Sequence, residues 1–162
     1  MADIVSAKFD FGDLLSSLDR FENVVQQKVL FTGAATMARV IYDEVKLNVQ
    51  PPRIGILTGN LDSAIYWAKS PEETTPTHVV YKVSWNKKKA PHGHLVEFGH
   101  KIPYFIFQLP NGEWRTDKKR PLAAPRFVRP YPFIRPAFSQ MGEAINAGLA
   151  NMTARFTREL GL

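Results

Sequence analysis

Apolar positions recur every three or four residues through the first fifty residues of the chain, which is the period of a helix with one buried face. Asp10 or Asp13 is placed to cap the start of such a helix, and Pro51-Pro52 end it because proline lacks the backbone N–H. We therefore expect one long helix over residues 10–50, able to curve or break near Gly33. Its apolar positions are Leu14, Leu18, Phe21, Val25, Val29, Met37, Ile41 and Val45.

The middle of the chain changes to the two-residue period of β-strands. Apolar and other side chains alternate in HVVYKVSW (residues 78–85), and IPYFIFQL (102–109) is aromatic and followed by the turn signal PNG, which predicts a hairpin. The earlier stretch LTGNLDSAIYWAKS (57–70) fits a short helix and a strand equally well. The proline- and arginine-rich DKKRPLAAPRFVRPYP (117–132) cannot be a central strand or a helix interior, and we place it in a basic loop or hairpin region.

Helical spacing returns in the last thirty residues, where Pro136 fits the first turn of a helix. The expected apolar stripe is Phe138, Met141, Ile145, Leu149, Met152, Phe156 and Leu160. These elements predict an α+β fold, with two helices packed on a small antiparallel sheet and an extended hairpin or loop arm. We expect a single domain over 1–162, made of the long helix (10–50), a sheet and basic loop or hairpin region (54–128) and a C-terminal helix (132–160).

Composition indicates a globular protein, with 44% apolar and 22% charged residues in 162. The absence of cysteine excludes disulfides and thiolate metal sites, and no apolar run approaches the ~20 residues of a membrane helix, so we expect a soluble protein without a membrane partner. Charge is segregated, because residues 82–135 hold twelve basic and three acidic side chains, a net +9, which leaves −3 for the rest. That pattern favours an anionic partner, although an ordinary solvated surface explains it equally well.

Three histidines surround one carboxylate in HGHLVEFGH (residues 92–100), the best candidate for metal or catalytic chemistry. The spacing of His92, His94 and Glu97 differs from the helical HExxH zinc motif, and on a strand Glu97 would point away from both imidazoles. The chain also has no nucleophile elbow and no phosphate-binding glycine loop. We therefore expect neither an enzyme nor a cofactor, and interpret the segment as a structural corner. In it Gly99 permits a turn, and Glu97 makes an ion pair or accepts backbone hydrogen bonds.

Three short motifs, LTGNLDSAI, HLVEFGH and PYPFIRPAF, follow one another along the chain. In this order they resemble the landmark motifs of the gene-product-ten-like tail-component family of long-tailed (HK-type, lambdoid) bacteriophages. His100 stands where that family usually has threonine or serine, Tyr131 where histidine is common, and the segment 101–128 is longer than typical. The matching residues are Thr58, Gly59, Leu61, Ser63, Ile65, Val96, Glu97, Phe98, Gly99, Pro130, Pro132, Phe133, Arg135, Pro136, Ala137 and Phe138.

The resemblance implies a structural protein of the virion, located in the neck or tail and assembled in the host cytoplasm. It implies head–tail joining or tail completion by a homo-oligomeric ring, expected to be a hexamer. Such a ring would surround the DNA channel between the tail tube or terminator and the portal-adaptor (connector) proteins. The alternative function is a non-specific nucleic-acid-binding module, and a metal-dependent hydrolase is the least favoured.

Two groups of residues are candidates for contacts with DNA or protein. The aromatic run YFIF is an interface arm or, equally well, a core hairpin; it comprises Tyr104, Phe105, Ile106 and Phe107. The basic candidates, facing DNA or a partner protein, are Lys87, Lys88, Lys89, Lys118, Lys119, Arg120, Arg126 and Arg129.

Overall fold

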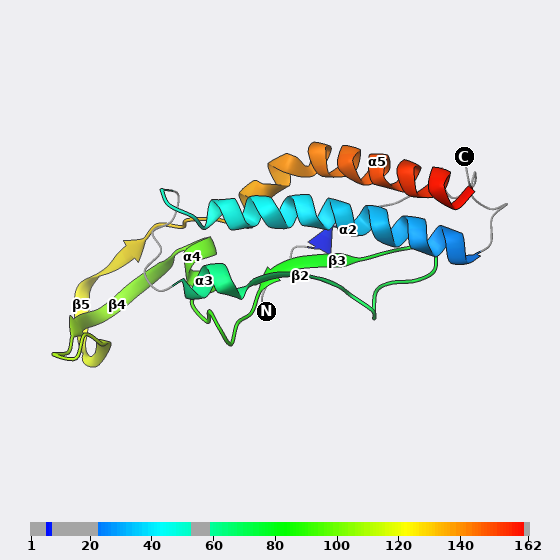
Figure 1. Ribbon diagram of the computed structural model, residues 1–162. Coiled ribbons are helices and arrows are strands. Elements are labelled where there is room, and N and C mark those ends of the chain that lie inside the picture. The colour runs from blue at the N-terminus through cyan, green and yellow to red at the C-terminus, as the bar shows by residue number, and fades with distance from the viewer. Residues whose placement is uncertain (1–5, 8–22, 53–58, 161–162) are drawn as a thin grey trace.

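The computed structural model describes residues 6–7, 23–52 and 59–160, and it has an α+β fold in three layers (Figure 1). Helix α5 (Met141–Leu160) packs on helix α2 (Asn23–Asn48), and α2 covers a small antiparallel sheet. The predicted fold class and both helices are confirmed. The prediction that both helices lie on the sheet is wrong, because α2 buries apolar side chains on two sides and so separates α5 from the strands.

Helix α2 continues without interruption through Gly33, where the sequence allowed a bend or break. A Cβ atom at Gly33 would overlap the side chain of Met152, and a Cβ atom at Gly148 of α5 would overlap Met37 of α2. Each helix therefore places a methionine against a glycine of the other. This reciprocal packing explains why glycine is kept inside both helices despite its poor helix propensity.

The prediction of the first helix can be compared with the structure at its C-terminal end but not at its N-terminal end. Its C-terminal end is confirmed, since α2 ends at Asn48 just before Pro51-Pro52. Its N-terminal part, with the candidate caps Asp10 and Asp13 and the apolar positions up to Phe21, lies outside the described residues.

The sheet consists of three antiparallel strands in the order β1-β3-β2. These are β1 (Ser6–Ala7), β2 (Ile65–Lys69) and β3 (Tyr81–Trp85). The predicted alternation holds in β3, whose Val83 and Trp85 are buried, although the strand starts at Tyr81 and not at residue 78. The ambiguous stretch 57–70 contains both alternatives in succession, because α3 (Asn60–Ala64) leads directly into β2.

The C-terminal helix starts later than predicted, with a 3-10 segment η1 (Arg135–Gln140) that holds Pro136 in its first turn. The predicted apolar stripe is wrong at Ile145 and Leu149, whose side chains are 38% and 42% exposed. The face of α5 against α2 instead has small residues, Ala144 and Gly148, because the two helices approach too closely there for larger ones.

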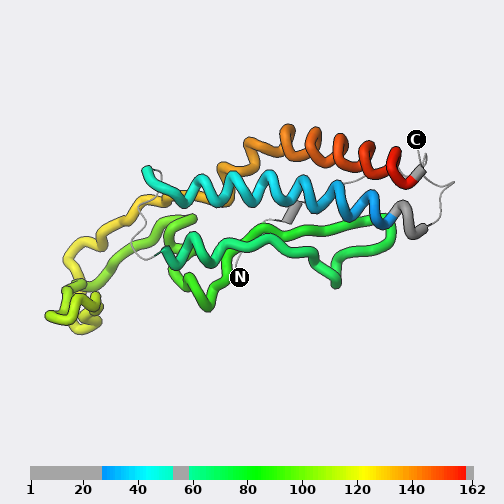
Figure 2. The backbone as a smooth tube through the Cα atoms, in the orientation of Figure 1, coloured from blue at the N-terminus to red at the C-terminus, as the bar shows by residue number. Residues whose placement is uncertain are grey.

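Strands β4 (His100–Gln108) and β5 (Trp114–Val128) form a separate antiparallel hairpin that projects from one end of the body (Figures 1 and 2). The predicted hairpin is confirmed, and its second strand, β5, includes most of the proline-rich segment and extends to Val128. As predicted, this segment is neither a central strand nor a helix interior. Its prolines are tolerated because both strands of a two-stranded ribbon are edge strands. We call residues 100–129 the arm.

The hydrophobic core lies between α2 and the sheet on one side, and between α2, α5 and the segment that leads into α5 on the other. Phe133 of that segment is fully buried, and its ring meets the indole of Trp85 edge to face, with the ring centroids 5.8 Å apart. None of the aromatic residues of the arm belongs to this core. Within the described residues, no helix is long and apolar enough to cross a membrane.

Candidate functional site

The segment HGHLVEFGH forms a short helix, α4 (Gly93–Phe98), and not the strand considered as one alternative. The helix begins under the indole of Trp85, which occupies the space that a side chain at Gly93 would need. It ends at Gly99, whose φ of +72° lies in the left-handed region that favours glycine. The predicted corner at Gly99 is confirmed, since the chain turns there from α4 into the arm.

Glu97 is the central residue of this corner, with a side chain that is only 2% exposed. One carboxylate oxygen, Oε2, accepts hydrogen bonds from the backbone N–H groups of Phe133 and Ile134, at 2.7 and 3.0 Å. The other, Oε1, accepts from the backbone N–H of Arg135 at 3.2 Å and from its Nε at 3.0 Å. The predicted roles of Glu97 are both present, because it pairs with a cation and also satisfies three backbone donors.

Further contacts join α4 to the start of the C-terminal helix. The guanidinium of Arg135 donates from an Nη atom to the backbone carbonyl of Glu97 at 2.8 Å and lies 5.0 Å from the ring centre of Phe98. The backbone N–H of Tyr131 donates to the carbonyl of Val96 at 2.8 Å. The motifs HLVEFGH and PYPFIRPAF, more than thirty residues apart, therefore form one structure. We call these contacts, centred on Glu97, the anchor.

Polar side chains at the C-terminal end of α2 and just after it form hydrogen bonds and an ion pair with the anchor and with the motif LTGNLDSAI. The side-chain amide of Asn48 donates to the carbonyl of Phe133 at 3.0 Å. Lys46 forms an ion pair of 2.6 Å with Asp62 of α3, and the same carboxylate oxygen accepts a hydrogen bond from the amide of Gln50 at 2.9 Å. The sequence motifs did not point to Asn48 or to the partners of Asp62. A polar residue at the apolar end of a helix is the signal that could have identified Asn48.

The remaining residues of the first motif surround a tight turn. Gly59 has a φ of +70° and precedes α3, and the backbone N–H of Ser63 donates to its carbonyl at 3.0 Å. Ile65 is buried in the core, and Leu61 packs against the core from its edge. Thr58 lies outside the described residues. Of the matched residues, Gly59 and Ser63 therefore shape the turn into α3, and Leu61 and Ile65 contribute to the core.

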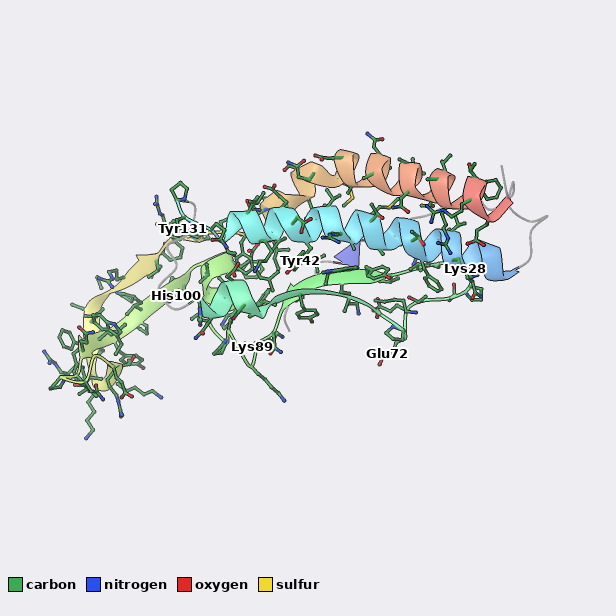
Figure 3. All side chains as sticks on the ribbon, in the orientation of Figure 1. Lys28, Tyr42, Glu72, Lys89, His100 and Tyr131 are labelled. Carbon is green, nitrogen blue, oxygen red and sulfur yellow. The ribbon has the colours of Figure 1, made fainter. Side chains whose placement is uncertain are left out.

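The histidines do not gather around a cavity or a common point. His92 and His94 are exposed, while His100 is half-buried at the root of the arm (Figure 3). No cluster of three metal-ligating side chains occurs in the described part of the chain. The Nδ1 atom of His100 is buried and has no hydrogen-bond partner among the described residues.

The arm reaches roughly 30 Å from the anchor, given nine residues in β4 and a rise of about 3.4 Å per residue. Along β4 the more exposed side chains, including Phe105 and Phe107, alternate with half-buried ones such as Ile102, Tyr104 and Ile106. The alternative of a core hairpin for the run YFIF is therefore wrong. Among the described residues, none of these four side chains belongs to the hydrophobic core.

Aromatic rings and cations are interleaved on the arm. The rings of Phe105 and Phe107 are stacked, with centroids 6.4 Å apart and an angle of 16° between their planes. The guanidinium of Arg120 lies over Phe105, 4.3 Å from the ring centre. Trp114, which none of the sequence motifs includes, is 68% exposed at the start of β5. A tryptophan within a strongly basic run of the sequence was the signal that could have identified Trp114 as a candidate contact residue.

The basic run KKR bulges out of the hairpin. Tyr104 of β4 pairs with Pro121 of β5, yet the next residue, Phe105, pairs with Asp117. Lys118, Lys119 and Arg120 therefore have no partners in β4, and all three are exposed. The bulge concentrates three cations at one point along the ribbon.

The eight basic residues that the sequence grouped together lie in separate places. Lys87, Lys88 and Lys89 belong to a turn after β3, and Lys89 points away from the body beneath the sheet (Figure 3). The other five are on the arm. Among them Arg129 is held at the root, because its Nε donates to the hydroxyl of Tyr131 at 2.7 Å.

A comparison of the chain with models of protein families, with curated proteins and with solved structures found no match. The contacts of the anchor and the exposed side chains of the arm are therefore the grounds on which a function can be assigned.

Proposed function

We propose that this chain is a structural protein of a tailed bacteriophage that joins head and tail or completes the tail at the neck. The observation that carries the proposal is the anchor. Two of the three motifs of the resemblance meet there through the hydrogen bonds of Glu97 to Phe133, Ile134 and Arg135. Residues that recur in a family because they hold its fold together are expected to touch one another, and these do.

The proposed protein acts without catalysis, as a ring of identical subunits around the channel through which DNA leaves the head. Contacts in such a ring are heterologous, so each subunit presents two different faces to its neighbours. In such a ring the arm, which extends well beyond the body and carries large exposed side chains, would be available to reach the DNA in the channel. The neighbours on the two sides of the ring would be the tail tube or terminator and the portal-adaptor proteins.

Deletion of the gene from its phage tests the proposal. We expect lysates of the deletion phage to contain separate filled heads and separate tails in electron micrographs. Purified protein added to that lysate should restore joined, infectious particles, whereas the Glu97→Ala variant, which removes the central carboxylate of the anchor, should not. Normal infectious particles from the deletion phage would refute the proposed function.

A further inference from the structure

Most of the net charge of the protein lies on the arm. Residues 100–129 contain seven basic and two acidic side chains, a net +5, while the whole chain carries +6. Within the described residues, none of the bulge cations Lys118, Lys119 and Arg120 forms an ion pair. Positive charge concentrated on a projecting element attracts polyanions, and no carboxylate of the described residues forms an ion pair with these cations, although Asp117 accepts a hydrogen bond from the backbone N–H of Lys119.

The ring beneath Arg120 holds the charge of its guanidinium in position. Since the guanidinium of Arg120 already lies over Phe105, and Phe107 stacks beside that ring, the aromatic pair supports a cation and contributes nothing to the core. A guanidinium that lies over a ring keeps its N–H donors at its edge, free to bind phosphate oxygens in pairs. The arrangement therefore suits phosphate groups better than carboxylates on a flat protein surface.

Charge and shape together favour nucleic acid over a second copy of the chain. A second copy of the chain itself carries a net charge of +6, of which +1 lies outside its arm, so it offers the arm no excess of negative charge. A two-stranded β-ribbon, in contrast, has the dimensions that the major groove of duplex DNA admits, at about 12 Å wide. Edge strands with proline and a charged bulge are also poor templates for strand pairing with another protein.

We infer that the arm is a ribbon that binds duplex DNA through its phosphates. Lys118, Lys119 and Arg120 contact the backbone, and Phe105 with Phe107 holds Arg120 in position. Phosphate contacts carry no information about base identity, so the binding is independent of DNA sequence. The inference stands whether or not the protein is a phage component, because free duplex DNA is the ligand that tests it.

The test uses the full-length protein and a fluorescent duplex of random sequence, about 30 base pairs or three turns long. Affinity is measured by anisotropy over a series of salt concentrations for the wild type and two triple variants. One variant replaces Lys118, Lys119 and Arg120 by glutamine. The matched control replaces Lys87, Lys88 and Lys89 by glutamine, which removes the same three charges from the turn beneath the sheet.

The loss of three phosphate contacts should reduce the slope of log affinity against log salt by about 2.7, since each contact contributes about 0.9. We expect the arm variant to show this reduction and at least about tenfold weaker binding near 0.1 M salt, and the control to keep most of the wild-type slope. The variant Phe105→Leu, which keeps every charge, should weaken binding to an intermediate extent. Unchanged circular dichroism of all variants would show that folding is not the cause.

Three results would overturn the inference. Equal losses in the two triple variants would mean that net charge, and not the arm, governs binding. Tighter binding of a single strand that is lost in Trp114→Ala would assign the arm to base stacking and not to duplex phosphates. A change in native mass of the arm variant, with DNA binding intact, would show that the arm meets a second copy of the chain.

Discussion

Replacing Glu97 by glutamine keeps the size of the side chain but changes its hydrogen bonding at the anchor. The carboxylate accepts four hydrogen bonds through two oxygens, whereas the amide has one accepting oxygen and one NH2 group, which only donates. We expect the amide oxygen to stay with the buried N–H groups of Phe133 and Ile134. The NH2 group then faces the donors of Arg135, whose side chain is 52% exposed and can turn to water.

The expected loss of stability follows from the burial of each donor. The backbone N–H of Arg135, left without an acceptor, costs about 1–3 kcal/mol. The bonds to Phe133 and Ile134 change from charge-assisted to neutral, which removes about 1 kcal/mol more. The ion pair itself contributes only about 0–1 kcal/mol, because the Arg135 side chain is 52% exposed and water screens its charge, although Glu97 is buried. Glu97→Gln should therefore lower the free energy of unfolding by about 2–4 kcal/mol, and Arg135→Gln by only about 1 kcal/mol.

Urea denaturation followed by circular dichroism measures both values, as a shift of the midpoint at an unchanged slope. Glu72→Gln, at an exposed turn, is the matched control and should change stability by less than about 0.5 kcal/mol. The prediction is refuted if Glu97→Gln costs no more than Arg135→Gln. In that case the ion pair, and not the satisfaction of backbone donors, would be the main contribution of Glu97.

Three further predictions concern the packing of the body and one titrating group. A Cβ atom at Gly99 would lie 2.7 Å from the carbonyl oxygen of Val128, and any side chain there would also be strained by the positive φ. Gly99→Val should therefore lower the free energy of unfolding, measured by urea denaturation, by at least about 1–3 kcal/mol. His92→Ala and His94→Ala, at exposed positions, should change stability little, and a loss equal to that of Gly99→Val would contradict the role assigned to Gly99. Gly33→Ala should cost about 1–3 kcal/mol by overpacking against Met152, and a double-mutant cycle with Met152→Ala should show a coupling of about 1–3 kcal/mol, whereas simple additivity would disprove the contact. Burial raises the pKa of the Tyr81 hydroxyl above its ordinary 10.0, so its contribution to stability is complete below about pH 10 and is lost as the pH rises through the raised pKa. The urea midpoint of Tyr81→Phe should therefore fall less steeply at alkaline pH than that of the wild type. Identical midpoints of the two proteins at every alkaline pH would argue against this titration.

The sequence predicted those features that depend on local pattern. The period of apolar residues identified α2 and α5, and the alternation in HVVYKVSW identified β3. Proline at 51 and 52 marked the end of the first helix. The resemblance also drew attention to Glu97 and Gly99, which the structure places at the anchor, although a motif alone does not say that two segments touch.

The errors arose where contacts between distant segments decide the outcome. Ile145 and Leu149 fit a helical stripe, but the spacing of α2 and α5 is set by Gly33 and Gly148, so smaller side chains face inward. The sequence excluded a central strand for the proline-rich segment but did not show that the segment pairs with β4 as an edge strand, because that pairing is not visible in local propensity. Likewise, the grouping of eight cations by sequence concealed that the fold separates three of them from the arm.

The two ends of the arm leave the body at almost one point. Gly99, the last residue before β4, packs directly against Pro130, the first after the arm, where a Cβ atom at Gly99 would lie 2.9 Å from the backbone nitrogen of Pro130. The hydrogen bonds of the anchor all lie on the body side of that point, and the core contains no residue of the arm. The arm can therefore be replaced without disturbing the body. Its length and side chains can change, or another hairpin can be grafted in its place, while the body keeps its own fold. Evolution and protein engineering can both alter what the arm binds without redesigning what carries it.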